Sequence, residues 1–246
     1  MDRSLFVVMS GARETLRAQT SVSNNLANVN TAGFKQDLEQ FRSMPVFGPG
    51  YPSRVYALNE RPATDFDPGP IQTTGRDLDV AVKGDGWIAV QAADGSEAYT
   101  RRGDLRITPE GLLQTGDGHP VLGENGPIAI PPAQKIDIGS DGTISIVPLG
   151  EKPDVLAVVD RIKLVRANPR QLKKGEDGLI RLKAGGPAVA DAGVTLVSGA
   201  LEGSNVNSVA ALVDMIELSR RYELQVKMMK TAEDDADATA QLLRMG

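Results

Sequence analysis

Residues 24–35 have the sequence Asn24-Asn25-Leu26-Ala27-Asn28-Val29-Asn30-Thr31-Ala32-Gly33-Phe34-Lys35 and close an N-terminal helical pattern. Four amide side chains fall within seven residues of this stretch. Asparagine is a mediocre helix former, because its side chain competes for main-chain hydrogen bonds. We therefore expect these amides to form hydrogen bonds with another surface. The candidate is a second long helix that the sequence predicts at the C-terminus.

The N-terminal residues, from 2 to about 30, are predicted to form one amphipathic helix that ends before Gly33, where a positive φ is tolerated. Its seam alternates steps of four and three, as in a coiled coil. Two interpretations remain open. The helix packs on its own domain, or it packs in a multi-helix assembly in which polar seam residues select the register. The seam consists of Leu5, Met9, Ala12, Leu16, Gln19, Ser23 and Leu26.

Residues 204–246 are predicted to form the second long helix, and several polar residues at their start can cap it. The seam again alternates steps of three and four, over more than four heptads. About 39 helical residues would span roughly 58 Å, which is longer than a small β-domain can cover. The N-terminal helix is the expected partner within the chain. The seam consists of Leu212, Met215, Ser219, Tyr222, Val226, Met229, Glu233, Ala236, Ala240 and Leu243, and the capping candidates are Ser204, Asn205, Asn207 and Ser208.

The middle of the chain is predicted to be all-β from residue 71 to about 201, because short alternating runs are separated by turn signals every eight to twelve residues. Residues 36–70 contain prolines and glycines that break any helix, and we predict an extended connector or small irregular subdomain there. Within it, residues 53–58 could form a strand. The predicted fold is therefore α+β. Residues 1–35 and 206–246 pack as a coiled-coil-like stem, and the C-terminal helical segment is counted from 202 to 246.

Composition excludes several classes of function. The formal net charge of -5 argues against nucleic-acid binding, and the absence of cysteine excludes disulfides and thiol chemistry. No apolar run is long enough to insert into a membrane, and the N-terminus does not resemble a signal peptide. The single histidine, His119, has no neighbouring ligand or nucleophile motif. We expect no catalytic residue, no cofactor and no metal.

Two terminal motifs resemble those of the bacterial flagellar rod, hook and hook-associated protein family. The first is residues 24–35. The second is residues 201–207, with the core Ser204-Asn205-Val206, followed by Arg220 and Tyr222-Glu223. Four central segments favour the rod proteins within this family, and the resemblance covers essentially the whole chain. These segments are 85–91, 94–101, 118–121 and 126–131.

The resemblance implies a non-enzymatic structural subunit of the flagellar basal-body rod, a tubular drive shaft that transmits torque from the motor to the hook. It favours a proximal rod subunit, with a distal rod or hook-type subunit as the alternative. It also implies other rod subunits and the flagellar type III export apparatus as partners. The expected location is the periplasmic rod of the basal body, reached without a cleaved signal peptide. The terminal helices would form the inner tube, with the β-domain outside it.

The helices at the two ends supply the predicted subunit interface, because two helices alone leave much of their apolar surface unburied. Repeated contacts of this kind need not close into a ring and can build a helical tube. The competing hypothesis is a periplasmic β-domain binding module or enzyme with a helical oligomerisation clamp, but the aromatic residues are too few and scattered to favour it. The predicted interface residues are Leu5, Met9, Leu16, Gln19, Asn24, Asn25, Leu26, Asn28, Thr31, Gly33, Phe34, Ser204, Asn205, Leu212, Met215, Arg220, Tyr222, Val226 and Met229.

Overall fold

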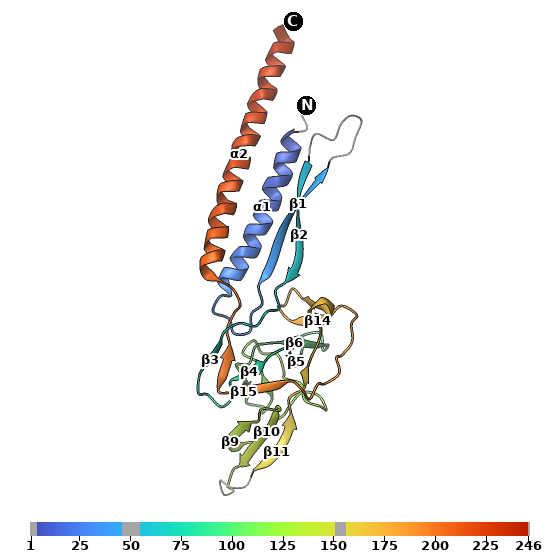
Figure 1. Cartoon of the computed structure of the whole chain (residues 1–246), viewed down its shortest axis with the longest axis vertical. Coiled ribbons are helices and arrows are strands. Elements are labelled where there is room, and N and C mark those ends of the chain that lie inside the picture. The colour runs from blue at the N-terminus through green and yellow to red at the C-terminus, as the bar shows by residue number, and fades with distance from the viewer. Residues whose placement is uncertain (1–3, 46–54, 151–155, 246) are drawn as a thin grey trace. The chain divides into compact units, whose positions relative to one another are not determined.

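The computed structural model describes residues 4–45, 55–150 and 156–245, which divide into two compact units (Figure 1). Unit 1 combines Met1–Asn28, Asp37–Asp65 and Val206–Gly246, and unit 2 combines Val29–Gln36 and Phe66–Asn205. Two long helices and a β-rich centre confirm the predicted α+β class. Unit 1 contains α1 (Ser4–Ala27), β1 (Asp37–Pro45), β2 (Val55–Thr64) and α2 (Ser208–Met245).

Both long helices form where the heptad pattern predicts them, and α2 begins at a polar cap. Of the four capping candidates, Asn207 takes this position. Its Oδ1 accepts hydrogen bonds from the main-chain N–H groups of Val209, at 3.0 Å, and Ala210, at 3.1 Å. These bonds satisfy donors that the first turn of a helix leaves without partners. Helix α1 begins at Ser4 within the described residues, so the predicted start at Asp2 lies outside them.

The two helices pack against each other in antiparallel directions, and α2 extends beyond α1 (Figure 1). A Cβ atom added to Gly11 would lie 3.0 Å from the side-chain nitrogen of Gln225, so these residues face each other. With this register, Ser4 lies level with Ala232, the last half-buried residue described on α2. The following 13 residues of α2, up to Met245, would project about 20 Å past Ser4.

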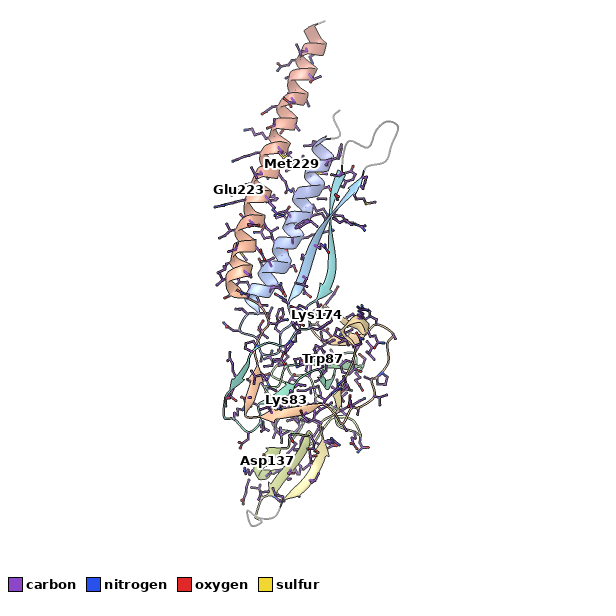
Figure 2. All side chains as sticks on the ribbon, viewed as in Figure 1. Lys83, Trp87, Asp137, Lys174, Glu223 and Met229 are labelled. Carbon is purple, nitrogen blue, oxygen red and sulfur yellow. The ribbon has the colours of Figure 1, made fainter. Side chains whose placement is uncertain are left out.

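The face that α1 buries only partly matches the predicted seam, in which Ala12 is buried but most of the large residues are exposed. Its most buried apolar residues are the small Ala12 and Ala18, whereas Leu5, Met9 and Leu16 remain exposed. Helix α1 packs against the β1–β2 hairpin as well as α2, and its small residues allow close approach on these sides. A heptad pattern assigns large apolar residues to the core. In α1, these large residues lie instead on the side that neither α2 nor the hairpin covers. On α2, Met229 lies toward α1 and Glu223 lies on the side that faces away (Figure 2).

Residues 37–45 and 55–64 form the two paired strands of a β-hairpin, within the segment predicted as an extended connector or small irregular subdomain. Strand β1 pairs antiparallel with β2, with Asp37 opposite Thr64 and Met44 opposite Tyr56. The residues suggested as a strand, 53–58, fall partly in β2, and 53–54 lie outside the described residues. The apolar side chains of this hairpin do not alternate between a buried and an exposed face, because Leu38, Phe41 and Met44 are all exposed. Period-two alternation, the usual strand signal, is therefore absent.

Unit 2 consists of small antiparallel sheets, as the turn spacing predicts. Its largest sheet has the order β12-β5-β6-β14-β13, and a second has the order β11-β10-β9. A large apolar core includes Ile88, Leu113 and Ile144, and a smaller core surrounds Trp87 and Tyr99. The elements are β3 (Ile71–Thr73), β4 (Val80–Lys83), β5 (Trp87–Gln91), β6 (Glu97–Thr100), β7 (Arg106–Ile107), β8 (Leu113–Gln114), β9 (Ala133–Ile138), β10 (Thr143–Pro148), β11 (Ala157–Arg161), β12 (Leu164–Val165), the 3-10 helix η1 (Pro169–Gln171), β13 (Leu172–Lys174), β14 (Ile180–Leu182), β15 (Thr195–Ser198) and β16 (Ala200–Glu202).

Tyr99 in the smaller core makes unit 2 sensitive to alkaline pH. Its hydroxyl donates a hydrogen bond to Glu97, at 2.9 Å, and accepts one from the Ala188 N–H, at 2.6 Å. Burial, with a contribution from Glu97, raises the pKa of Tyr99 from 10.0 to about 12. Because the folded state holds this proton more tightly, the stabilisation is complete below pH 10 and is lost between about pH 10 and 12, a loss of roughly 2–3 kcal/mol.

Urea unfolding between pH 8 and 12, followed by the fluorescence of the single tryptophan, Trp87, measures this loss. Tyr99→Phe removes the titrating group, so its unfolding free energy should decline less over this range than that of the original chain. Lysines also titrate there, which makes the difference between the two chains the relevant quantity. Equal declines would show that Tyr99 does not titrate with folding.

Candidate assembly surface and the buried junction of the terminal motifs

Asn25, in the N-terminal motif, joins α1 to the hairpin of unit 1. It is buried, its Nδ2 donates to the main-chain oxygen of Asp37 at 2.8 Å, and its Oδ1 accepts from the Asp37 N–H at 3.0 Å. Both amide atoms of Asn25 therefore have partners in the same chain, on β1 and not on α2. Asn28 donates to the main-chain oxygen of Asn24, at 2.9 Å, one turn earlier. Amides near the helix end thus bond locally, and any bonds they form between subunits stay a prediction.

The paired hydrogen bonds of Asn25 predict a local loss of stability when they are removed. Asn25→Ala removes both hydrogen bonds to the main chain of Asp37, which should destabilise unit 1 by about 1–3 kcal/mol. Thermal or urea unfolding followed by far-ultraviolet circular dichroism reports this, because the helices dominate that signal. The matched control is the exposed neighbour, Asn24→Ala, which should change stability by no more than about 0.5 kcal/mol. Equal effects of the two substitutions would contradict the role of Asn25.

The second half of the N-terminal motif belongs to unit 2, where it meets the C-terminal motif. The Gly33 N–H donates to the main-chain oxygen of Glu202 at 2.7 Å. The Asn205 Oδ1 accepts from the Gln36 N–H at 2.8 Å, and its Nδ2 donates to the Asp67 oxygen at 3.2 Å. The two motifs, separated by about 170 residues of sequence, therefore form one hydrogen-bonded junction.

Three charged side chains lie buried at this junction. The Lys35 Nζ lies 2.6 Å from Glu202 Oε1, and the Arg101 Nη1 lies 2.9 Å from Glu202 Oε2. Their side chains are at most 2% exposed. The Gly69 N–H also donates to Glu202 Oε1, at 3.0 Å. We call Lys35, Arg101 and Glu202 the junction triad. Sequence reasoning missed it, although Lys35 and Glu202 stand inside the two quoted motifs.

Aromatic rings cover the cations of this junction. The Arg101 guanidinium carbon lies 5.1 Å from the centre of the Trp87 ring, and Phe66 meets Trp87 edge to face. The Lys174 Nζ lies 4.1 Å above the Phe34 ring and donates to the main-chain oxygen of Lys35. Figure 2 labels Trp87 and Lys174 within unit 2. Trp87 is therefore a built-in spectroscopic reporter of the junction triad.

Unit 1 exposes large apolar side chains on its helices and hairpin. On α2, Leu212 is 47% exposed and Ile216 is 54% exposed. On α1, Met9 is 52% exposed. We call the exposed large apolar residues of α1, the hairpin and the first part of α2 together the apolar face of unit 1. It comprises Leu5, Phe6, Met9 and Leu16 on α1, Leu38, Phe41, Met44 and Val55 on the hairpin, and Val209, Leu212, Val213 and Ile216 on α2.

The predicted interface residues fall into three groups. Leu5, Met9, Leu16, Asn24, Leu212, Arg220 and Val226 are exposed; Gln19, Leu26, Asn28, Thr31, Gly33, Phe34, Asn205, Met215, Tyr222 and Met229 are half-buried; Asn25 and Ser204 are buried. The sequence prediction did not include the exposed hairpin residues, because that segment was expected to be irregular. For all nineteen predicted interface residues, the role in subunit contacts stays a prediction.

The described residues present neither a metal site nor a membrane-spanning helix. These residues contain no cluster of three or more histidine, aspartate or glutamate side chains that could hold a metal ion. None of their helices combines the length and the hydropathy that a membrane-spanning segment requires.

Three protein families match separate parts of the chain, one near each end and one in the middle. "Flagella basal body rod protein" matches residues 5–35, "Flagellar hook protein FlgE/F/G D1 domain" matches residues 81–146, and "Flagellar basal body rod FlgEFG protein C-terminal" matches residues 197–242. The chain is 45% identical over 251 residues to the flagellar basal-body rod protein FlgF of Escherichia coli (strain K12), and the match covers 100% of both chains.

Of two further relatives, one is a FlgF protein and the other is a FlgG protein. The FlgF protein of Salmonella typhimurium is 42% identical over 251 residues, with 100% of both chains covered. The rod protein FlgG of Bacillus subtilis (strain 168) is 34% identical over 257 residues, covering 95% of this chain and 96% of the relative. The chain belongs to the family of flagellar basal-body rod proteins. Within that family it is FlgF-like.

Proposed function

We propose that the chain is a proximal rod subunit that self-assembles through unit 1 and, as part of a tubular shaft, transmits torque from the motor to the hook. The observation that carries this proposal is the apolar face of unit 1. Leu212, Ile216 and Met9 are each about half exposed in the isolated chain. Membership of the rod protein family indicates that the partners are other rod components.

The same proposal assigns the remaining parts of the chain. Helices α1 and α2 form a coiled-coil-like stem that lines the inner tube, within residues 1–35 and 206–246. Residues 71–201 form the outer β-domain, and residues 36–70 connect it to the stem. The subunit acts in the periplasmic rod of the basal body after delivery by the flagellar type III export apparatus, and it carries out no catalysis. The higher identity to the FlgF proteins of Escherichia coli and Salmonella typhimurium, 45% and 42%, than to the FlgG of Bacillus subtilis, 34%, favours a proximal over a distal position.

Complementation of strains that lack a rod protein distinguishes a proximal rod subunit from a distal one. The chain is expressed in one strain that lacks FlgF and in another that lacks FlgG, and swimming and isolated basal bodies are compared. The proposal predicts that swimming returns in the strain without FlgF and that the chain is recovered in its basal bodies. Recovery only in the strain without FlgG would favour the distal rod alternative. Recovery solely as a soluble protein, without swimming in either strain, would contradict a rod function.

A periplasmic binding module or enzyme remains the competing proposal from another class. It requires a ligand-binding centre, and the described residues of unit 2 show packed side chains around Trp87 and Tyr99 instead of an aromatic platform. Substrate and ligand screening of the full chain tests it directly. Specific turnover or saturable binding of a small molecule would rank it above the rod proposal.

A further inference from the structure

Glu202 is the common acceptor for segments that lie far apart in sequence. Its carboxylate receives hydrogen bonds from Lys35, Gly69 and Arg101. Lys35 precedes it by 167 residues and Arg101 by 101. Its main-chain oxygen also accepts from the Gly33 N–H. Without this carboxylate, Lys35, Gly69 and Arg101 lose a partner at the same place, whereas the bond from Gly33 to the main chain is independent of the side chain.

We propose that Glu202 closes the fold of unit 2: the packing around Trp87 becomes native only when Glu202 has reached Lys35 and Arg101. Two cations precede the carboxylate in the chain and end at most 2% exposed. Moving a charged group out of water is strongly unfavourable unless it is paired and hydrogen-bonded. The cations therefore stay hydrated, and the segments that carry them stay open, until residue 202 arrives.

Arg101 links the junction triad to the smaller apolar core of unit 2. Arg101 Nη2 donates to the Gly84 oxygen at 2.7 Å, and its guanidinium lies against Trp87. Trp87 is 4% exposed and packs among residues of β6, β12, β13 and β14. Burying Arg101 and completing the packing of Trp87 are therefore one event. If the subunit is exported as proposed above, the requirement for Glu202 would keep the preceding chain unfolded until the C-terminal motif is present. This use rests on the proposed function.

The test is stopped-flow refolding of the purified full chain from urea, followed by Trp87 fluorescence and by circular dichroism. Glu202→Gln keeps the shape of the side chain and removes its charge. The folding rate should fall by at least about a hundredfold, because one partner of buried charge pairs is lost. The unfolding rate should change less than about threefold, as for contacts that are already present in the transition state. The matched control is Glu217→Gln, whose carboxylate is 59% exposed beside Arg221 and should leave both rates unchanged.

A second variant covers the case in which Glu202→Gln does not fold. Replacing all three residues by methionine, Lys35→Met with Arg101→Met and Glu202→Met, removes every charge of the junction triad. Buried ion pairs can often be replaced by apolar residues without loss of stability, so this variant should fold, and faster than Glu202→Gln. Failure of both variants to fold would overturn the proposal, as would a Glu202→Gln effect confined to the unfolding rate. Since the measurement needs no rod, its failure would leave the proposed rod function standing.

Discussion

Replacing Gly33 by alanine is expected to lower the unfolding free energy of unit 2 by about 4 kcal/mol or more. Gly33 has φ of +66°, and an added Cβ atom would overlap the main chain of Arg101 and Arg102, lying 2.6 Å from the Arg101 oxygen. Main-chain atoms cannot rotate away as a side chain can. The substitution therefore forces residue 33 away from the main chain of Arg101 and Arg102, at the position where the Gly33 N–H donates its hydrogen bond to Glu202.

A matched control isolates the overlap from the cost of a positive φ. Gly95 has φ of +79°, and its added Cβ atom would meet nothing within 4 Å. Gly95→Ala should therefore cost only about 1–2 kcal/mol, the penalty for a left-handed main chain. Urea unfolding followed by Trp87 fluorescence compares the two variants in the same unit. If Gly33→Ala were as mild as Gly95→Ala, the close contact at the junction would not hold in solution.

The second large effect concerns assembly and not folding. The double substitution Leu212→Asp with Ile216→Asp should leave the isolated chain folded, within about 1 kcal/mol, because both side chains are about half exposed. It should abolish swimming and remove the chain from isolated basal bodies, since carboxylates would have to be desolvated in an apolar contact between subunits. Circular dichroism of the purified variant and swimming assays of the complemented strain measure the two halves of this prediction.

The control applies the same chemistry to a different surface. Val158 and Val189 are 70% and 87% exposed in unit 2, so Val158→Asp with Val189→Asp should leave swimming intact. Normal swimming by the Leu212→Asp, Ile216→Asp chain would show that this part of α2 is not an assembly contact. Loss of swimming by both double variants would show that the effect is not specific to the apolar face.

Periodicity predicted what depends on local sequence. It located both long helices, the Asn207 cap as one of four candidates, and strands such as β5 and β10, because the spacing of apolar residues and turns is a local signal. It did not identify the hairpin strand β1, whose apolar residues are exposed instead of alternating. The short strands β3, β15 and β16 lie within or at the edge of the predicted all-β region, but their pairing, β3 with β16 and β15 with β4, joins distant segments that no local pattern relates.

The junction triad could not be predicted, because pairing between residues 35, 101 and 202 follows from the folded topology and not from sequence spacing. The Asn cluster shows an intermediate case. Its density correctly indicated hydrogen bonding, but the partner of Asn25 is β1 of the same chain. Likewise, α1 buries Ala18, which lies outside the predicted seam, because it packs on both α2 and the hairpin, a property that a heptad count cannot reveal.

Thiol labelling tests the central claim, that the apolar face of unit 1 is buried between subunits in the rod. The chain has no cysteine, so Leu212→Cys introduces one reactive position, and Val189→Cys provides a control in unit 2. Labelling rates are measured on the purified chain and on isolated basal bodies. We expect Leu212→Cys to react at least about tenfold more slowly in basal bodies, as for a site removed from solvent, whereas Val189→Cys should change little. Equal labelling of Leu212→Cys in the free chain and in basal bodies would contradict the central claim.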